Sequence, residues 1–263
     1  MARQSTIQRG IFSIEKGARL IEVLTRQGGG MTLSALAQAA ELAPSIAHRY
    51  LVSLMRSALV EQLGNGLYDL GPLTLAAGLA KLSRQDEYRV GLRFLDQLAE
   101  RTRETVLMTL WTGHGVVVVR WLESPHLLTI HVRPGANLPL LNSASGRLFA
   151  AFLPPRVTEP TLTAERAAGG VAVAPDGALS EAEFAQELEE IRARGQSRVM
   201  GGLAPGVGAM AAPVFAAGGE IALGFAIVGP MGTLDTAWEG EPARILREMT
   251  AACTRALGGM APA

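Results

Sequence analysis

The stretch TLSALAQAAELAPSIAHRYLVSL, residues 32–54, decides the fold of the first part of the chain. Its apolar residues recur at helical spacing on both sides of residues 41–43, which predicts two helices joined by a tight turn. Thr32 is placed to cap the first helix. Pro44 suits the first turn of the second, because the N–H that proline lacks has no partner inside the helix there. Two helices with this spacing are typical of a helix-turn-helix.

The segments on either side extend this motif. A preceding helix is expected from a cap at Ser13 to about Arg26, where Gly28–Gly30 end it. The helix that begins at Pro44 is expected to reach about Ala58. After it, two short β-prone runs flank Gly64–Gly66, whose residues accept positive φ and indicate a hairpin. Three helices followed by a hairpin predict a winged helix-turn-helix.

The helix predicted from Pro44 carries polar side chains on the surface that its apolar stripe, Ala47, Leu51 and Leu54, leaves free. The major groove of DNA admits such a helix, since arginine binds guanine through two hydrogen bonds while serine and histidine reach bases or phosphates. Taken alone, this face is better explained by contact with solvent, and its neighbours reverse that preference in favour of DNA. The expected contacts to double-stranded DNA come from Arg9, Thr32, Ser45, Ile46, His48, Arg49, Ser53 and Asn65.

Residues 73–82, LTLAAGLAKL, predict a helix that is apolar almost all round. Such a helix buries its surface against a partner, and a second copy of the chain is the simplest one, so we expect a homo-oligomer. The region 73–90 is expected to connect two halves of the protein.

The second half changes character. Its β-rich runs and its helices predict an antiparallel sheet covered by helices, which makes the protein α+β. The expected strands are 105–111, 116–123, 127–135, 209–216 and 221–229, and the expected helices are 146–153, 181–195 and 238–257.

Composition bounds the class of protein. The chain has 263 residues, of which 48% are hydrophobic and 18% charged, as in folded proteins long enough for two domains. No apolar run approaches the ~18 residues of a membrane span, and the start lacks a signal-peptide core, so we expect no membrane association and a cytoplasmic location. The single cysteine, Cys253, excludes an intramolecular disulfide. The net charge of zero does not by itself indicate DNA binding.

An enzyme is the alternative from another class. The four histidines, His48, His114, His126 and His131, lack the spacing of a metal-binding motif. Neither a G-x-S-x-G elbow nor a lysine-bearing phosphate loop occurs. We therefore expect no catalytic residue, no metal and no cofactor. A small-molecule hydrolase remains as an alternative, as does a DNA-binding regulator whose second half only dimerises or binds a protein partner.

Five segments, in order, resemble the IclR-type transcriptional regulators over nearly the whole chain. They are KGARLIEVL (16–24), the opening stretch (32–54), LYDLGPLTLAAGL (67–79), LPLLNSASGRLFAAFLP (138–154) and GVGAMAAPVFAAGGEIALGFAIVGP (206–230). The resemblance implies a winged helix-turn-helix domain at 1–72, a connecting and dimerisation helix at 73–90, and a GAF-like effector-binding domain at 91–263. It implies a dimer or tetramer on inverted-repeat DNA. Two residues depart from the family pattern: Ile46 replaces a threonine in the recognition helix, and Arg147 replaces a lysine.

The resemblance also implies a pocket for a small organic acid between the sheet and residues 142–146. Backbone N–H groups at a helix start can hold a carboxylate, and alanines where relatives carry thiols or hydroxyls favour an aromatic or longer aliphatic acid. Core packing and helix capping explain the same residues, so both interpretations stay open. Thr129, His131 and Arg133 share one strand face and are expected to meet solvent. The expected effector-binding residues are Met108, Leu110, Ser143, Ala144, Ser145, Gly146, Ala209, Met210, Ala226 and Val228.

Overall fold

The structure, a computed structural model, describes residues 10–124, 132–174 and 177–261. Its internal contacts divide the chain into one unit up to Arg84 and a second unit from Gln85. The region expected as a single connector, 73–90, holds parts of two helices, which end and begin on either side of residues 83–85.

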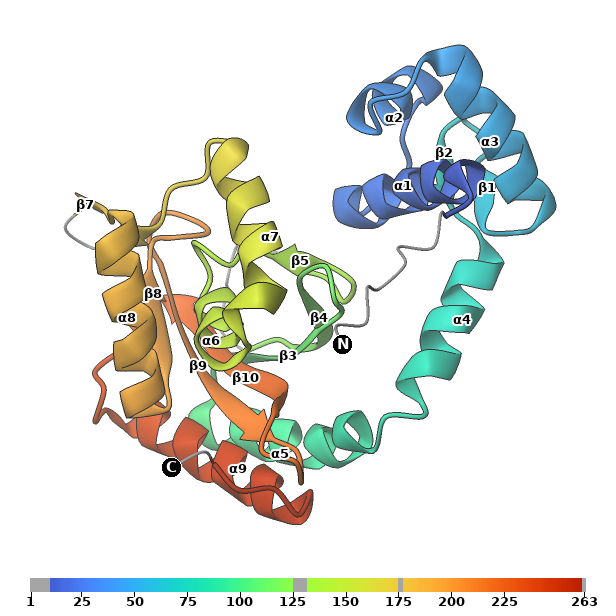
Figure 1. Ribbon diagram of the computed structural model, residues 1–263. Coiled ribbons are helices and arrows are strands. Elements are labelled where there is room, and N and C mark those ends of the chain that lie inside the picture. Colours follow the sequence, from blue (N-terminus) through green and yellow to red (C-terminus); the bar gives the residue numbers. More distant parts are fainter. Residues whose placement is uncertain (1–9, 125–131, 175–176, 262–263) are drawn as a thin grey trace, which may run out of the picture. The chain divides into compact units, whose positions relative to one another are not determined.

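The first unit is a winged helix-turn-helix, as predicted (Figure 1). Its core joins the three helices and the hairpin, with Leu20, Leu24, Leu36 and Leu51 almost fully buried. The hairpin strands pair antiparallel, with Val60 opposite Leu70. The elements are α1 (Phe12–Gln27), α2 (Leu33–Ala39), α3 (Pro44–Arg56), β1 (Val60–Gln62), β2 (Tyr68–Leu70) and α4 (Pro72–Leu82).

Details of α1 correct the prediction. The helix begins after Ile11, so the cap expected at Ser13 is wrong. Ile14 is 66% exposed, and the buried residues of the helix are Gly17, Leu20 and Leu24.

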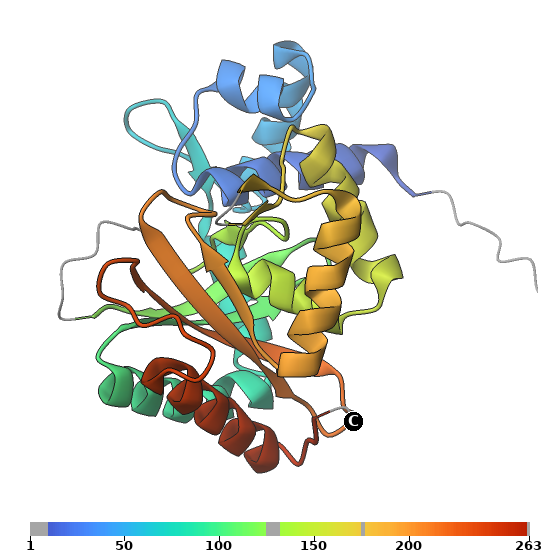
Figure 2. The same ribbon diagram turned by 90° about the vertical axis from the view of Figure 1, so that its left-hand side faces the viewer.

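The second unit is built on a six-stranded antiparallel sheet with strand order β5-β4-β3-β10-β9-β8. Helices lie on both of its faces, as Figure 2 shows. A short hairpin, β6 and β7, lies outside this sheet. The strands are β3 (Thr105–Trp111), β4 (Val116–Leu122), β5 (Asn137–Leu138), β6 (Val173–Ala174), β7 (Gly177–Ala178), β8 (Ser197–Met200), β9 (Val207–Phe215) and β10 (Ile221–Pro230). The helices are α5 (Asp86–Thr102), α6 (Ala144–Phe152), α7 (Pro155–Ala167), α8 (Glu181–Arg194) and α9 (Glu241–Ala256).

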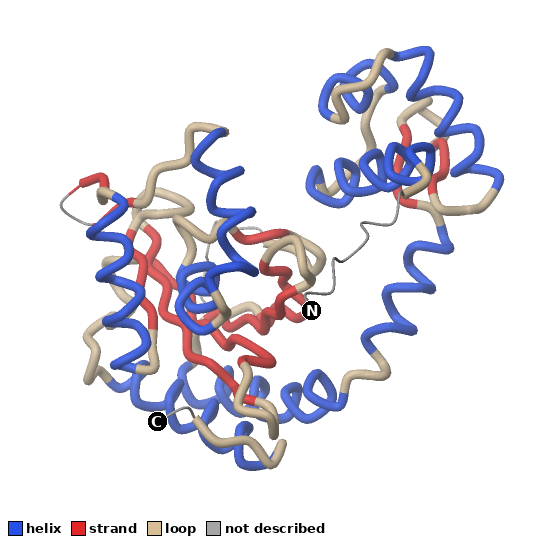
Figure 3. The backbone as a smooth tube through the Cα atoms, in the orientation of Figure 1, coloured by secondary structure: helices blue, strands red, loops and turns tan. Residues whose placement is uncertain are grey.

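Alternation along the strands assigns the side chains to two apolar cores. Met108, Met210 and Phe225 face α5 and α9, which pack side by side (Figure 2). Leu107 and Ala226 face α6 and α8 on the other side. Successive residues of a strand point to opposite faces, so the sheet separates the two cores. Figure 3 shows the strands with helices on either side of them.

Several local predictions have clear outcomes. The helix expected at 181–195 is present as α8: Ser180 caps it and Gly195 ends it with φ +64°. The helix α7 and the edge strand β8 were not predicted, because the apolar pattern of α7 is weak and Pro160 lies inside it. The strand expected at 127–135 lies largely outside the described residues, and so do Thr129 and His131. Arg133 is described and lies in a loop. Among the described residues, no helix is long and apolar enough to cross a bilayer.

Candidate functional site

The exposed face of α3 lies opposite the residues that anchor the helix. Ala47 and Leu51 are fully buried against α1, α2 and the hairpin, which orients the helix on the domain. The exposed residues recur every three or four positions and so share one face: Ser45, His48, Arg49, Val52, Ser53 and Arg56.

The cationic groups of this face are free to contact a ligand. Arg49 and Arg56 are exposed, and neither forms an ion pair or a side-chain hydrogen bond within the described part of the chain. The Ser53 hydroxyl instead donates a 3.4 Å bond to the Arg49 carbonyl of its own helix. The face therefore presents two guanidiniums with Val52, 38% exposed, between them in the sequence.

The other residues expected to touch DNA have different surroundings. Thr32 caps α2, accepting a 3.3 Å bond from the Ala35 N–H, so its hydroxyl has a structural role. Asn65 lies at the hairpin tip and accepts a 3.1 Å bond from the Leu67 N–H. Ile46 is half-buried, and Arg9 lies outside the described residues. Val52 and Arg56 belong to the exposed face but were not in the predicted set; their spacing from Arg49 is the signal that identifies them.

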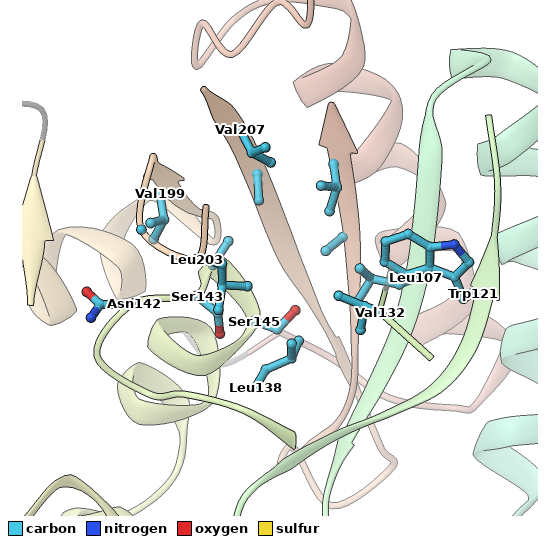
Figure 4. A pocket seen from close by; sticks show the side chains of 15 residues that line it. Leu107, Trp121, Val132, Leu138, Asn142, Ser143, Ser145, Val199, Leu203 and Val207 are labelled. Carbon is cyan, nitrogen blue, oxygen red and sulfur yellow. The ribbon is translucent and has the colours of Figure 1, made fainter. Parts of the chain in front are cut away.

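A cavity in the second unit lies between the sheet and the start of α6 (Figure 4). It encloses about 490 Å³ of space, its open mouth included. Apolar side chains from both the sheet and the loop that precedes β9 form most of its wall. The lining residues are Leu107, Trp121, Val132, Leu138, Asn142, Ser143, Ala144, Ser145, Val199, Gly202, Leu203, Val207, Ala209, Ala226 and Val228.

Most polar groups of the lining already have partners. The Ser143 hydroxyl donates a 2.7 Å bond to the Pro139 carbonyl and accepts a 2.8 Å bond from the Gly146 N–H, which caps α6. The Asn142 amide bonds the backbone of residues 171 and 173. These groups fix the cavity wall and leave little capacity for a ligand.

The first turn of α6 supplies the free polar groups. The Ala144 and Ser145 N–H groups occupy the first two helical positions, which have no acceptor inside a helix. Within the described residues, the Ser145 hydroxyl has no hydrogen-bond partner. Figure 4 shows its side chain pointing into the space between α6 and the sheet. Hydrogen-bond donors therefore meet at a helix N-terminus, where the helix dipole favours an anion.

Buried polar contacts hold this turn in place. The Glu165 carboxylate accepts bonds of 2.8 and 3.0 Å from the Leu140 and Leu141 N–H groups. Arg147, 1% exposed, donates to the carbonyls of Leu141 and Val173 and to Glu187. A β-carbon at Gly146 would collide with the Pro139 carbonyl, so only glycine permits this approach.

The predicted effector set divides between two faces of the sheet. Six of its members line the cavity: Ser143, Ala144, Ser145, Ala209, Ala226 and Val228. Met108, Leu110 and Met210 were wrongly assigned, because they alternate onto the opposite face and pack in the α5 and α9 core. Gly146 permits the close approach of α6 to the Pro139 carbonyl and does not line the cavity. Leu107 and Trp121 also line the cavity but were not in the predicted set. Leu107 is adjacent to Met108 and therefore points to the opposite face of the sheet, and Trp121 lies opposite Leu107 in the pairing of β3 with β4.

The amino-acid sequence matches two family models. The model described as the IclR helix-turn-helix domain covers residues 13–64, and the model described as Bacterial transcriptional regulator IclR C-terminal covers residues 79–255. The chain belongs to the IclR family of bacterial transcriptional regulators. Proteins of this family are DNA-binding regulators and not enzymes, which removes the hydrolase alternative.

Individual relatives agree with this family. The Glycerol operon regulatory protein of Streptomyces griseus is 29% identical over 254 residues, which span 95% of this IclR-family chain and 98% of that protein. The crystal structure of Pseudomonas aeruginosa HmgR is 33% identical, with a TM-score of 0.60 and coverage of 95% and 99%. An IclR homolog from Microbacterium hydrocarbonoxydans, complexed with 4-hydroxybenzoate, shares the fold with a TM-score of 0.72 at 21% identity, covering 93% and 98%.

Proposed function

We propose that this IclR-family regulator binds operator DNA through the exposed face of α3 and binds a small organic acid with an apolar body in the cavity beside α6. The observation that carries the effector proposal is a cluster of free donors in an otherwise apolar cavity. These donors are the Ala144 and Ser145 N–H groups and the Ser145 hydroxyl.

The chemistry of the cavity favours a monocarboxylate. Its lining contains no cationic side chain among the described residues, so neutral donors and the helix dipole hold the acid group. Leu107, Trp121 and Val228 offer apolar contact to the rest of the ligand. The 4-hydroxybenzoate bound by the Microbacterium homolog is an acid of this class. Aromatic or longer aliphatic carboxylates are therefore the proposed effectors.

On the DNA side, Arg49 binds base edges or phosphates in the major groove, with Ser45 and His48 beside it. The exposed guanidiniums of Arg49 and Arg56 support this assignment. Asn65 at the hairpin tip and Arg9 contact phosphate or the minor groove. Because Ser53 and Thr32 bond their own backbone, they have smaller roles in this interface.

A second copy of the chain covers α4. Every residue of this helix is at least partly exposed, and three of its four leucines are exposed: Leu73 (45%), Leu75 (66%) and Leu79 (58%). An apolar helix with no buried residue of its own is stabilised by association, and a symmetric pair matches an inverted-repeat operator. Effector binding then shifts the population of the paired winged helices between two arrangements, provided that the acid prefers one of them.

The test is a gel-shift titration of the purified full chain on DNA upstream of its own gene, with and without benzoate, 4-hydroxybenzoate and hexanoate. Arg49→Ala is expected to weaken operator binding by ~1–3 kcal/mol if its contact to guanine is bidentate. Ser145→Ala should leave the affinity for DNA intact. It should weaken binding of the effector by ~0.5–1.5 kcal/mol, because one hydrogen bond is lost.

The controls are Arg156→Ala and Thr163→Ala, which alter exposed side chains of α7. If no acid changes operator binding and calorimetry detects no binding of any acid, the alternative is supported in which the second unit only dimerises or binds a protein. Unchanged DNA affinity of Arg49→Ala removes that residue from the interface.

A further inference from the structure

A second cleft in the unit from Gln85 is separate from the effector cavity. It lies between α8, β8 and the segment around Trp238, and it encloses about 630 Å³ of space, its open mouth included. Its wall carries charged and aromatic side chains, in contrast to the apolar cavity. Those that matter for binding are Glu187, Glu190, Arg194, Arg198 and Trp238.

Two arginines of the cleft are held against the same indole. The guanidinium carbon of Arg194 lies 4.9 Å from the centroid of the Trp238 ring, and that of Arg198 lies 4.5 Å from it. Arg198 Nη1 also donates a 2.9 Å bond to the Thr236 carbonyl. Contact with an aromatic ring orients a guanidinium and leaves donors at its edge available. The indole thus positions two cationic forks beside one cleft.

These guanidiniums have no anionic partner within the described residues. The structure contains ion pairs for Arg147, Arg192 and Arg247 nearby, but none for Arg194 or Arg198. Glu187 is already bound to Arg147 at 2.6 Å, which leaves the exposed Glu190 as the free carboxylate of the wall. Two unpaired positive groups against one unpaired negative group favour an anionic ligand.

We propose that this cleft binds a small dianion, a dicarboxylate or a phosphate, between Arg194 and Arg198. Planar guanidiniums match the geometry of both anions through paired N–H bonds, and two of them suit a ligand with two negative charges. This second site does not depend on the proposed effector, whose cavity lacks cationic groups. Val199 lines both spaces, so the two sites are neighbours across β8.

The test is calorimetry of the purified full chain at constant ionic strength, with succinate, inorganic phosphate and acetate as probes. Saturable binding of succinate or phosphate is expected with a Kd of ~1 mM or tighter, and the preferred probe tells dicarboxylate from phosphate. Acetate, a monoanion, should bind at least ~10-fold more weakly because it engages one fork only. Arg194→Ala should weaken the dianion at least ~10-fold, since one charge-assisted contact is lost.

Arg194 is the informative position because its side chain is exposed and makes no described hydrogen bond, so its replacement leaves folding intact. Arg156→Ala, an exposed arginine of α7, is the matched control and should bind like the wild type. Ser145→Ala should also retain dianion binding. The proposal is overturned if neither dianion binds saturably up to ~10 mM, or if Arg194→Ala binds as the wild type does. It is likewise overturned if Ser145→Ala abolishes binding, which would assign the dianion to the effector cavity.

Discussion

Arg147 Nη1 donates a 2.6 Å hydrogen bond to Glu187 Oε1 and thereby ties α6 to α8. The same guanidinium bonds the carbonyls of Leu141 and Val173 at 2.8 and 2.6 Å, and its side chain is almost completely buried. One cation thus joins the loop before α6, the β6 hairpin and the helix α8. A lysine at this position has a single ammonium, which cannot reproduce the planar fork.

Arg147→Met is expected to lower the free energy of unfolding by ~3–5 kcal/mol, because it leaves buried acceptors without their donor. Arg147→Lys should cost less, ~1–3 kcal/mol, since it keeps the charge but loses part of the hydrogen bonding. Urea denaturation of the full chain measures both. Arg156→Lys, at an exposed site, serves as the control. Equal stability of Arg147→Met and the wild type would show that these bonds contribute nothing net.

Val52 is expected to contact the methyl group of a thymine in the operator. It is 38% exposed on the α3 face, three residues after Arg49 and four before Arg56. Apolar side chains in the major groove contact the thymine C5-methyl, and one methyl group is worth ~0.8 kcal/mol. Gel shifts on operators in which each thymine is replaced in turn by deoxyuridine should reveal one sensitive position per half-site.

In Val52→Ala that position should lose its sensitivity, while Ser53→Ala should keep it. If uracil has the same effect on wild type and Val52→Ala at every position, Val52 makes no such contact. For each protein variant, the experiment compares the affinity for an operator with thymine and for one with uracil at the same position. A general loss of affinity in a variant therefore cancels from the comparison.

The exposed leucines of α4 predict the effect of charge on assembly. Leu75→Glu and Leu79→Glu should shift the protein toward smaller oligomers, because a carboxylate placed in an apolar contact loses hydration without a partner. Size-exclusion chromatography with light scattering measures the mass. Ser83→Glu adds the same charge just after the helix and removes no apolar surface, so its mass should not change. Unaltered mass of both leucine variants would place the contact elsewhere.

Cys253 is expected to resist thiol reagents in the native protein. Burial in the α5 and α9 core raises the pKa of its thiol from 9.0 to about 12, so the nucleophilic thiolate is scarce at neutral pH. The unfolded chain ionises at lower pH than the native one, so stability should fall as pH rises from 9 toward 12. Labelling with a disulfide reagent at pH 8 should be slow without urea and fast with it. Rapid labelling of the native protein would contradict the buried position.

Local patterns in the sequence were sufficient for the winged helix-turn-helix and for most strands. Thr32 and Ser180 cap their helices with short-range hydrogen bonds, whereas Pro44 and Gly195 act through backbone conformation. Such local signals do not depend on the rest of the fold. The Gly64–Gly66 turn sets the hairpin in the same way. The helix α7 escaped prediction because its pattern is weak and its place depends on packing against α6.

Only the tertiary structure decided which residues share the cavity beside α6. Met108 and Leu107 are adjacent in sequence, yet their side chains lie on opposite faces of the sheet. Which of the two alternating sets of strand residues faces α6 depends on helices that are distant in the chain. The same holds for the cleft at Trp238, where arginines from α8 and β8 meet an indole about 40 residues along the sequence. By itself, the sequence determined the family, the secondary structure near strong caps and turns, and the helix that we propose to face DNA. The folded chain decided the sites, because their members come together only through long-range packing.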